Sequence, residues 1–407
     1  MTKGAAMNGH DDPTASSTSV LRIMNERALF EQLLRHGPVS RPQLAAATGL
    51  SKPTISVALA DLERVGVVRS VGLATGGTGR AAQLYEIHPQ AGWVMAFDVG
   101  RSFVRVALAT LTGETVVRRD VRSRARSAVG LLAQLGLLTQ EITEEAGITP
   151  DAVTYTVFGT PGTHDQATGA LRLAPNLPGW NRPGSVDRLR TVTGSPFLVE
   201  NDINLAALGE QAHGLGGDVD DFVFMSIGTG IGMGVVLGGR LHRGAQRAAG
   251  EISYLPFGES DPLAAGAVSR RRGLLESVAS ADAVVAVARR FGMSGRISAK
   301  RIFDAARAGD ATALRVVEAE ADHLAHALAS VIAVLDPELV VLGGGIGAHG
   351  GELLVAPVRE RLGDLVPLRP PRIEASALGD GAVVLGALAT GLRHARDLVF
   401  QRALAVD

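Results

Sequence analysis

Three glycine-rich turns, each after an apolar segment typical of a strand, are the part of this 407-residue sequence best suited to binding chemistry. Missing side chains and free N–H groups allow a close approach of the backbone to a phosphate or a flat ring. Each turn alone is better explained as a tight turn of an α/β sheet, but three in this order favour a binding site. The residues that would face the bound group are Asp98, Gly100, Gly228, Thr229, Gly230, Gly232, Gly343, Gly344 and Gly345.

A carboxylate with two possible roles lies between the first and second turns. Asp202 stands in FLVENDINLAALGE, where a predicted strand continues into a helix. It could cap a helix over residues 203–212, which the local sequence favours. It could also act as a general base toward a sugar hydroxyl at the mouth of a cleft. The local sequence alone does not decide between the two.

A repeated plan of elements must position these residues. A strand, a glycine turn, a second strand and a hairpin occur in WVMAFDVG with FVRVALATL, and again in DFVFMSIGTG with GMGVVLGGRL. Helical segments follow each copy. The repeat predicts two similar α/β lobes, over about residues 93–200 and 201–390, with a cleft between them and a C-terminal helix.

The N-terminal part has a different organisation. Residues 1–18 are polar and predicted to be disordered. Residues 19–88 predict three short helices, the second with Ser40 as its N-cap and the third beginning at Ser51. Two strands then flank the glycine-rich loop LATGGTGRA. This order is typical of a winged helix-turn-helix.

Charge supports a nucleic-acid partner for this segment. Residues 19–82 contain eight basic and four acidic residues, a net charge of +4, whereas the whole chain carries −1. The alternative is a helical module that docks another protein, but an arginine on a glycine-rich loop suits the minor groove better. The predicted DNA-contacting residues are Ser51, Lys52, Thr54, Ser56, Val57 and Arg80.

Four motifs in order, behind a winged helix, resemble the ROK family of sugar-responsive repressors and sugar kinases: FGTPGTHDQATGALRLAPNLPGWNRP, VENDINLAALGE, SIGTGIGMGVVLGGRLHRGAQRAAGEI and LVVLGGGIG. The resemblance implies that residues 89–407 are an effector domain with the actin-like, ribonuclease-H-like fold of sugar kinases. It implies a nucleotide role for the glycine turns and a catalytic role for Asp202 in any kinase. The implied sugar pocket contains Asn201, Asp202, Glu251, Glu276 and, with its role open between packing and ligand binding, Tyr254.

Three departures from the family argue against catalysis. The family's Asp-x-Gly-Gly-Thr-Lys is here Asp98-Val99-Gly100-Arg101-Ser102-Phe103, which loses a glycine and the lysine. The family's Gly-His after the sugar-binding Glu is here Ser253-Tyr254. The segment that binds zinc in the family has no cysteine, so we expect no metal and no bound cofactor, with ATP doubtful. Arg101 could instead bind a phosphate on an effector.

The remaining composition sets wider limits. The chain contains no Cys, which excludes disulfides and thiolate metal sites. Its N-terminus has no apolar core of the signal-peptide type, and no apolar stretch is long enough for a membrane span. We therefore expect a cytoplasmic protein without a membrane partner.

Together these features predict a repressor of the one-component type. A winged head would bind operator DNA as a homodimer or homotetramer, and a degenerate kinase body would bind a sugar or sugar phosphate. The alternative is an ATP-dependent sugar kinase that carries a DNA-binding domain.

Overall fold

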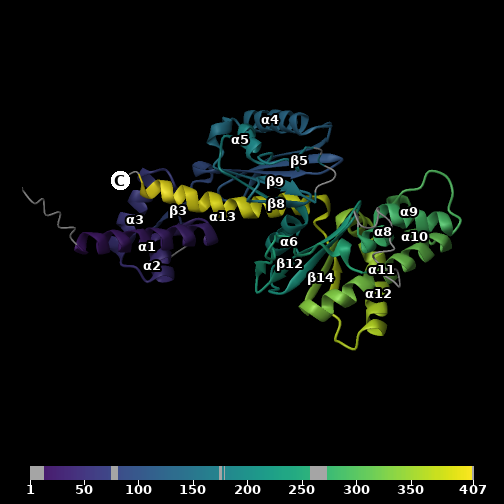
Figure 1. Ribbon diagram of the computed structural model, residues 1–407. Helices are drawn as coiled ribbons and strands as arrows, with labels where there is room; N and C mark the ends of the chain where they lie inside the picture. The colour runs from purple at the N-terminus through teal and green to yellow at the C-terminus, as the bar shows by residue number, and fades with distance from the viewer. Residues whose placement is uncertain (1–12, 75–80, 174–176, 178, 257–272, 406–407) are drawn as a thin grey trace, which may run out of the picture.

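The computed structural model describes residues 13–74, 81–173, 177, 179–256 and 273–405, with side chains from residue 20 onward (Figure 1). Its N-terminal head contains three helices and a three-stranded sheet of order β1-β3-β2. The three predicted helices and both wing strands are present. The elements of the head are α1 (Pro13–His36), β1 (Val39–Ser40), α2 (Arg41–Thr48), α3 (Lys52–Arg64), β2 (Val68–Leu73) and β3 (Gln83–Ile87).

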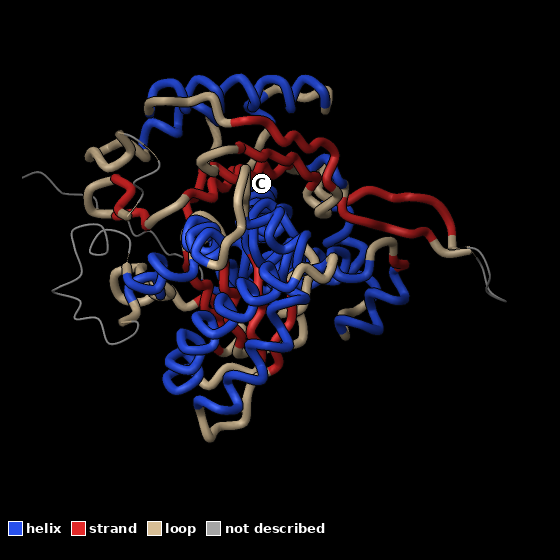
Figure 2. The backbone as a smooth tube through the Cα atoms, turned by 90° about the vertical axis from the view of Figure 1, so that its right-hand side faces the viewer, coloured by secondary structure: helices blue, strands red, loops and turns tan. Residues whose placement is uncertain are grey.

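Local sequence explains the boundaries of these helices. Ser40 precedes α2, and its backbone N–H donates to Gln43 Oε1. Gly49 ends α2 with a φ of 71°, a conformation that glycine adopts without a steric cost. Ser51 caps α3 by accepting from Thr54 N. The hairpin of β2 and β3 projects sideways from the protein (Figure 2).

The first helix is longer than the sequence predicted. It begins at Pro13, so the expectation of a disordered tail over residues 1–18 is wrong for residues 13–18. Proline fits the first turn of a helix, where its missing N–H has no intrahelical partner. Polar composition alone therefore did not mark the start of this helix.

Two five-stranded sheets with the same topology form the body. Their orders are β10-β7-β4-β5-β6 and β13-β12-β11-β14-β15. In each sheet the central strand pairs antiparallel with the next strand in the chain and parallel with the fourth strand of its set. The strands are β4 (Trp93–Val99), β5 (Phe103–Thr110), β6 (Thr115–Arg122), β7 (Tyr155–Thr160), β10 (Phe197–Asn201), β11 (Phe222–Ile227), β12 (Ile231–Leu237), β13 (Arg240–Leu241), β14 (Leu339–Gly343) and β15 (Arg372–Ala375).

Helices cover both faces of each sheet. On β4, Met95 and Phe97 pack toward α4 and Val94 and Ala96 toward α13, because neighbouring side chains of a strand point to opposite faces. Strand β11 is likewise buried on both faces, between α6 and the group α8 to α12. The main helices are α4 (Ala128–Glu145), α5 (Arg190–Thr193), α6 (Asp202–His213), α8 (Leu274–Ala279), α9 (Ala281–Arg290), α10 (Ala299–Arg307), α11 (Ala311–Leu335), α12 (Gly344–Leu365) and α13 (Ala382–Leu404).

The two sheets do not correspond to two separate stretches of chain. Asn201 is the last residue of β10 in the first sheet, and α13 packs on β4 and β7 of the same sheet. The predicted boundary at residues 200 and 201 therefore does not divide two compact units. The chain returns to the first sheet through its last helix.

None of the described helices is both long enough and apolar enough to span a bilayer.

The last helix also joins the body to the head (Figure 1). The Phe400 ring lies 5.5 Å from the Phe30 ring of α1, and both side chains are buried. Asp397 pairs with Arg27 at 2.7 Å, and the Arg27 guanidinium also lies over the Phe400 ring. Head, first sheet and α13 thus share one apolar cluster.

We predict that Phe400→Ala loosens the head. Removal of a buried phenylalanine costs about 3 to 5 kcal/mol where the site cannot collapse. Hydrogen exchange should become faster in α1 and α3, with a smaller change in the second sheet. The control is Leu137→Ala on the exposed side of α4, where the side chain is 59% exposed. Unchanged exchange in α1 would contradict a structural role of this contact.

Candidate functional site

Four carboxylates from separate elements assemble in the body. Asp98 is the second-last residue of β4, Asp202 begins α6, Glu251 follows the loop after β13, and Glu276 lies in α8. Electrostatic interactions link Asp98 to Asp202, Asp202 to Glu251 and Glu251 to Glu276. Glu276 Oε2 also accepts from Ile231 N at 3.4 Å, beside the second glycine turn. We call Asp98, Asp202, Glu251 and Glu276 the acidic cluster.

Asn201 rather than Asp202 caps α6. Its Oδ1 accepts from Ile203 N at 2.9 Å and from Asn204 N at 3.1 Å. The interpretation of Asp202 as the N-cap is therefore wrong, because the preceding amide already satisfies the first turn. Asp202 Oδ1 accepts from Ile203 N at 2.9 Å. The Asn201 side chain also donates to Gly162 O at 3.1 Å, which ties the start of α6 to the turn before β8 (Thr163–Asp165).

Burial and repulsion between neighbouring carboxylates raise the pKa values of three members of the acidic cluster, Asp98, Asp202 and Glu251. Burial, then repulsion from Asp202, raises the pKa of Asp98 to about 7, although the nearby Arg105 opposes the shift. Burial raises the pKa of Asp202 to about 6, with a further contribution from Glu251. The pKa of Glu251 is raised by burial and then by Glu276. These carboxylates are thus already partly desolvated, as is typical of functional sites.

An arginine missed in the sequence analysis connects three carboxylates. The Arg105 guanidinium lies 2.9 Å from Asp98, 3.0 Å from Asp380 and 3.5 Å from Asp120. Asp380 is in the 3-10 turn Gly379–Gly381, directly before α13. In the sequence, Arg105 stands out as a charged residue at an inward position of the otherwise apolar strand VRVALA, and this signal could have identified it. Arg105 therefore joins the acidic cluster to the start of α13.

The glycines of the second and third turns are not all needed for the same structural reason. A Cβ at Gly232 would lie 2.4 Å from the Ile203 side chain, and one at Gly343 would meet the Phe224 ring at 2.2 Å. Gly344 has a φ of 74° and backbone within 2.7 Å. A Cβ at Gly228 would instead meet only Gly345 N, at 3.6 Å, and Gly345 has open space around it.

Packing thus requires Gly232, Gly343 and Gly344, whereas Gly228 and Gly345 border free space. Thr229 is exposed next to that space. A Cβ at Gly230 would lie 2.9 Å from Glu276 Oε2, so this glycine lets the carboxylate approach the turn. At the first turn, Gly100 N donates to Phe103 O at 3.0 Å, which closes the hairpin that carries Arg101.

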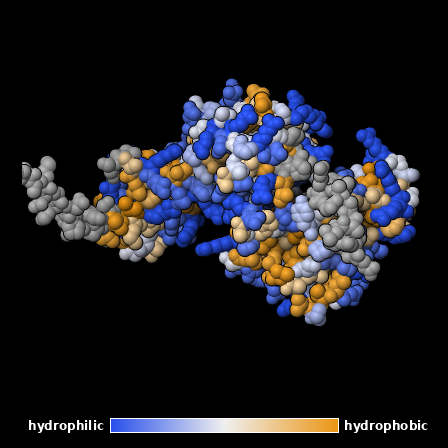
Figure 3. Space-filling model, viewed as in Figure 1, coloured by the Kyte–Doolittle hydropathy of each residue, from blue (hydrophilic) through white to orange (hydrophobic). Residues whose placement is uncertain are grey.

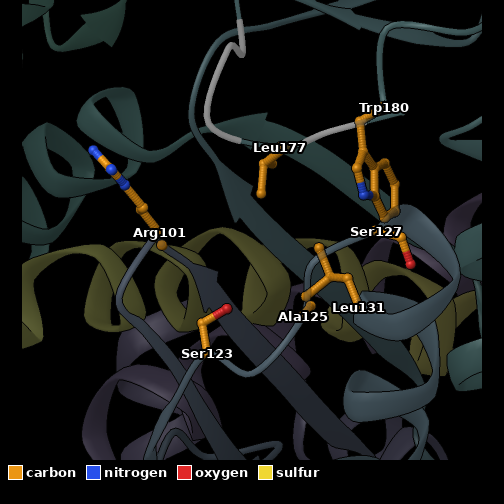
Figure 4. Close-up of a pocket in the computed structure, with 8 residues that line it drawn as sticks. Arg101, Ser123, Ala125, Ser127, Leu131, Leu177 and Trp180 are labelled. Carbon is orange, nitrogen blue, oxygen red and sulfur yellow. The ribbon is translucent and has the colours of Figure 1, made fainter.

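A small cavity, open to solvent, lies beside Arg101. Its lining includes Ser123, Ser127, Leu131 and Trp180 (Figure 4). The Arg101 side chain points away from Leu177 and Trp180, which leaves its guanidinium outside the cavity (Figure 4).

The other predicted ligand and metal positions differ in accessibility. Tyr254 lies in the 3-10 turn Ile252–Tyr254 with its side chain 45% exposed, so core packing does not account for it. Most of the segment aligned with the family's zinc ligands, including Ala267 and Ser269, lies outside the described residues. Among the described residues, no group of three or more His, Asp or Glu side chains is arranged to hold a metal ion.

The predicted DNA-contacting residues lie at the N-terminal end of α3. Lys52 and Val57 are exposed, Val57 by 59%, and Ser56 is partly exposed. The hydroxyls of Ser51 and Thr54 contact each other at 2.8 Å, which joins the N-cap Ser51 to the first turn of this helix. Arg80 lies outside the described residues. On the space-filling surface, apolar and polar residues alternate over the head (Figure 3).

Comparison with known proteins places these features in a family. The model described as "ROK family" matches residues 94–393. A xylose repressor of Caldicellulosiruptor bescii is 26% identical over 91% of this chain and 96% of that protein. A glucokinase of Thermotoga maritima is 36% identical over 57% of this chain and 77% of that protein.

Solved structures agree with this assignment. A ROK family transcriptional regulator, described as a homologue of the Escherichia coli Mlc protein, matches 96% of this chain and all of that chain with a TM-score of 0.75 and 23% identity. A ROK glucokinase from Streptomyces griseus, solved with glucose and AMPPNP, matches 74% of this chain and all of that chain with a TM-score of 0.63 and 26% identity. The predicted actin-like, ribonuclease-H-like fold is thereby confirmed. The chain belongs to the ROK family.

Proposed function

We propose that the protein is a sugar-responsive transcriptional repressor of the one-component type. Its head binds operator DNA, and its acidic cluster binds a sugar or sugar phosphate. The observation that carries this proposal is the continuous packing of α13, which begins beside the acidic cluster and ends against the head. Full-length similarity to xylose repressors supports the same conclusion.

The acidic cluster suits a ligand with many hydroxyls. Ionised carboxylates accept hydrogen bonds from O–H groups and reject analogues that lack them. Asn201 lies at the start of α6, next to the cluster, but both ends of its side-chain amide already have partners. Its N–H donates to Gly162 O, and its oxygen accepts from Ile203 N of the helix. We therefore assign direct ligand contacts to Asp202, Glu251 and Glu276, and a positioning role to Asn201. The exposed side chain of Tyr254 interacts electrostatically with Glu251 and Glu276 of the same cluster.

The ligand signal would reach the head through α13. Arg105 pairs with both Asp98 and Asp380, and Asp98 interacts electrostatically with Asp202. A change of charge at Asp202 would therefore change the ion pair between Arg105 and Asp380, which holds the start of α13. At its other end, Asp397 and Phe400 hold α1. A helix of 23 residues spans roughly 35 Å and transmits a displacement as a rigid body. Ligand binding thereby changes the placement of the head.

Operator recognition would require more than one copy of the chain. Winged helix-turn-helix proteins read two half-sites whose spacing matches the separation of two heads. We therefore propose a homodimer or homotetramer in which the ligand changes that separation and lowers DNA affinity. The protein would act in the cytoplasm, where it can reach its operator.

A sugar kinase is the second candidate, because Gly228 and Gly345 border open space of the kind that a nucleotide could enter. The first turn does not fit this role. It lacks the second glycine and the lysine of family kinases, and its Asp98 is paired with Arg105. Fold and function are separable, and the body would retain a kinase fold as a sensor.

We predict that Lys52→Ala weakens DNA binding at every sequence. Loss of one phosphate contact should lower the slope of log affinity against log salt by about 1. Fluorescence anisotropy with operator and unrelated DNA measures both effects, and Lys300→Ala on α10 is the matched control. Operator binding by a chain that lacks residues 1–90 would show that the head is not the DNA-binding part.

We predict that sugar binding weakens as the pH falls through about 6. Below the folded-state pKa, Asp202 is protonated and accepts hydrogen bonds poorly, so affinity at pH 5 should be roughly tenfold lower than at pH 7.5. Calorimetry with a panel of hexoses and pentoses measures this change. Asp202→Asn should bind weakly at both values and show little pH dependence. A constant affinity across this range would remove Asp202 from the ligand site.

We predict no sugar-dependent release of ADP above background. The first turn lacks the second glycine, which lets the backbone approach the phosphates in family kinases, and it lacks their lysine. A coupled assay across the same sugars, with the Thermotoga maritima glucokinase as positive control, measures turnover. Turnover that disappears in Asp202→Asn would establish the kinase candidate instead.

A further inference from the structure

Two arginines of one loop converge on a buried carboxylate next to the acidic cluster. Arg243 Nε and Arg247 Nη2 lie 2.6 and 3.2 Å from the same atom, Glu200 Oε2. The Glu200 side chain is 3% exposed, and its Oε1 accepts from Asn201 N and Asn204 Nδ2. The loop follows β13 of the second sheet, whereas Glu200 lies in β10 of the first. The ion pairs therefore connect the two sheets.

The two guanidinium groups carry more charge and more donors than Glu200 can satisfy. Two positive charges against one carboxylate leave a net charge of about +1. Each guanidinium has about five N–H donors, yet the hydrogen bonds described for Arg243 and Arg247 both end on one oxygen. Their side chains are 35% and 26% exposed, so the other donors can be reached from solvent. One arginine would be enough to neutralise Glu200.

The backbone of Arg247 is strained. Its φ of 57° lies in the left-handed region, which residues with a Cβ rarely adopt. The turn holds it there, since Arg247 N donates to Gly244 O at 3.2 Å and Ala249 N to Arg243 O at 3.1 Å. Glycine would adopt this conformation without strain. A side chain retained at such a position is typical of a functional site.

The arginine pair borders the acidic cluster. Glu200 directly precedes Asn201 and Asp202 in the sequence. Glu251 N donates to Ala248 O, in the loop that carries the two arginines, at 3.4 Å. His164 of β8 interacts electrostatically with Arg247. Its pKa is lowered by burial and then by Arg247, so it is mostly neutral at pH 7. One ligand can therefore contact the carboxylates with its hydroxyls and the arginines with another group.

We propose that Arg247, together with Arg243, forms a subsite for an anionic group of the effector. The effector is then a sugar phosphate or a sugar acid rather than a neutral sugar. A guanidinium binds either anion through a forked pair of hydrogen bonds. The arginines also offset the repulsion between such a ligand and the acidic cluster. This inference rests on the proposed function, because it assumes that the acidic cluster binds the sugar part.

Calorimetry on the full-length protein tests the subsite. The probes are glucose, mannose and galactose, each as the free hexose, the 6-phosphate and the uronate, with inorganic phosphate alone as a further probe. We expect one anionic member to bind at least about tenfold more tightly than its neutral parent. The phosphate and uronate arms show which anion is preferred. Arg247→Gln should reduce the preference to below about threefold and leave the affinity for the neutral parent within about twofold.

Arg247→Gly separates ligand binding from stability. Because glycine relieves the strained φ, this variant should melt no lower than the wild type while it loses the anion preference. If Arg247 served only to neutralise Glu200, Arg247→Gly would lower the melting temperature and weaken all the sugars equally. Arg240→Gln, at an exposed position of β13, is the matched control.

The outcomes that overturn the inference differ from those that overturn the proposed function. A neutral sugar that binds as tightly as its anionic forms, or a preference that survives Arg247→Gln, overturns the subsite and leaves sugar sensing intact. If no sugar binds and none changes DNA affinity, the proposed function fails, and the subsite fails with it.

Discussion

The close contact between α6 and α13 is the constraint on which the rest of the structure depends. A Cβ at Gly386 would lie 1.7 Å from Leu205 O, and one at Gly209 would lie 2.3 Å from Ala382 O. The two helices therefore touch at the level of the backbone, where no flexible side chain can absorb a movement. Since α6 begins at the acidic cluster and α13 ends at the head, the contact makes the two sites parts of one rigid assembly.

Charge determines how that assembly can move. Several carboxylates lie close together at the junction of the sheets, and burying them is unfavourable unless each finds a partner. Arg105 compensates Asp98, and Arg243 and Arg247 compensate Glu200. Asp202 and Glu251 have no such cationic partner among the described contacts, which leaves them available to a ligand. A ligand that satisfies them changes the electrostatic balance at both ends of the network.

The sequence predicted the parts of the protein that depend on local pattern. The period of apolar residues indicated both glycine-turn hairpins and the helices of the head, and Ser40 and Ser51 marked helix starts. The order of the motifs indicated the fold. The contacts that join distant segments could not be predicted in this way, because Arg105 with Asp380 and Phe30 with Phe400 meet only after the chain has folded. The cap of α6 was assigned to Asp202 for a related reason, since local preference did not distinguish two adjacent polar residues.

The glycines of the body illustrate how a kinase fold can persist without kinase chemistry. Gly232 and Gly343 are needed for packing against Ile203 and Phe224, so their loss would disrupt the fold whether or not a nucleotide binds. In the same turns Gly228 and Gly345 border open space, and the fold itself does not require them to stay bare. A glycine motif can therefore reflect two different constraints, close packing of neighbouring side chains and access of a ligand to the backbone. The packing constraint alone keeps Gly232 and Gly343 in the pattern, whichever chemistry the body performs.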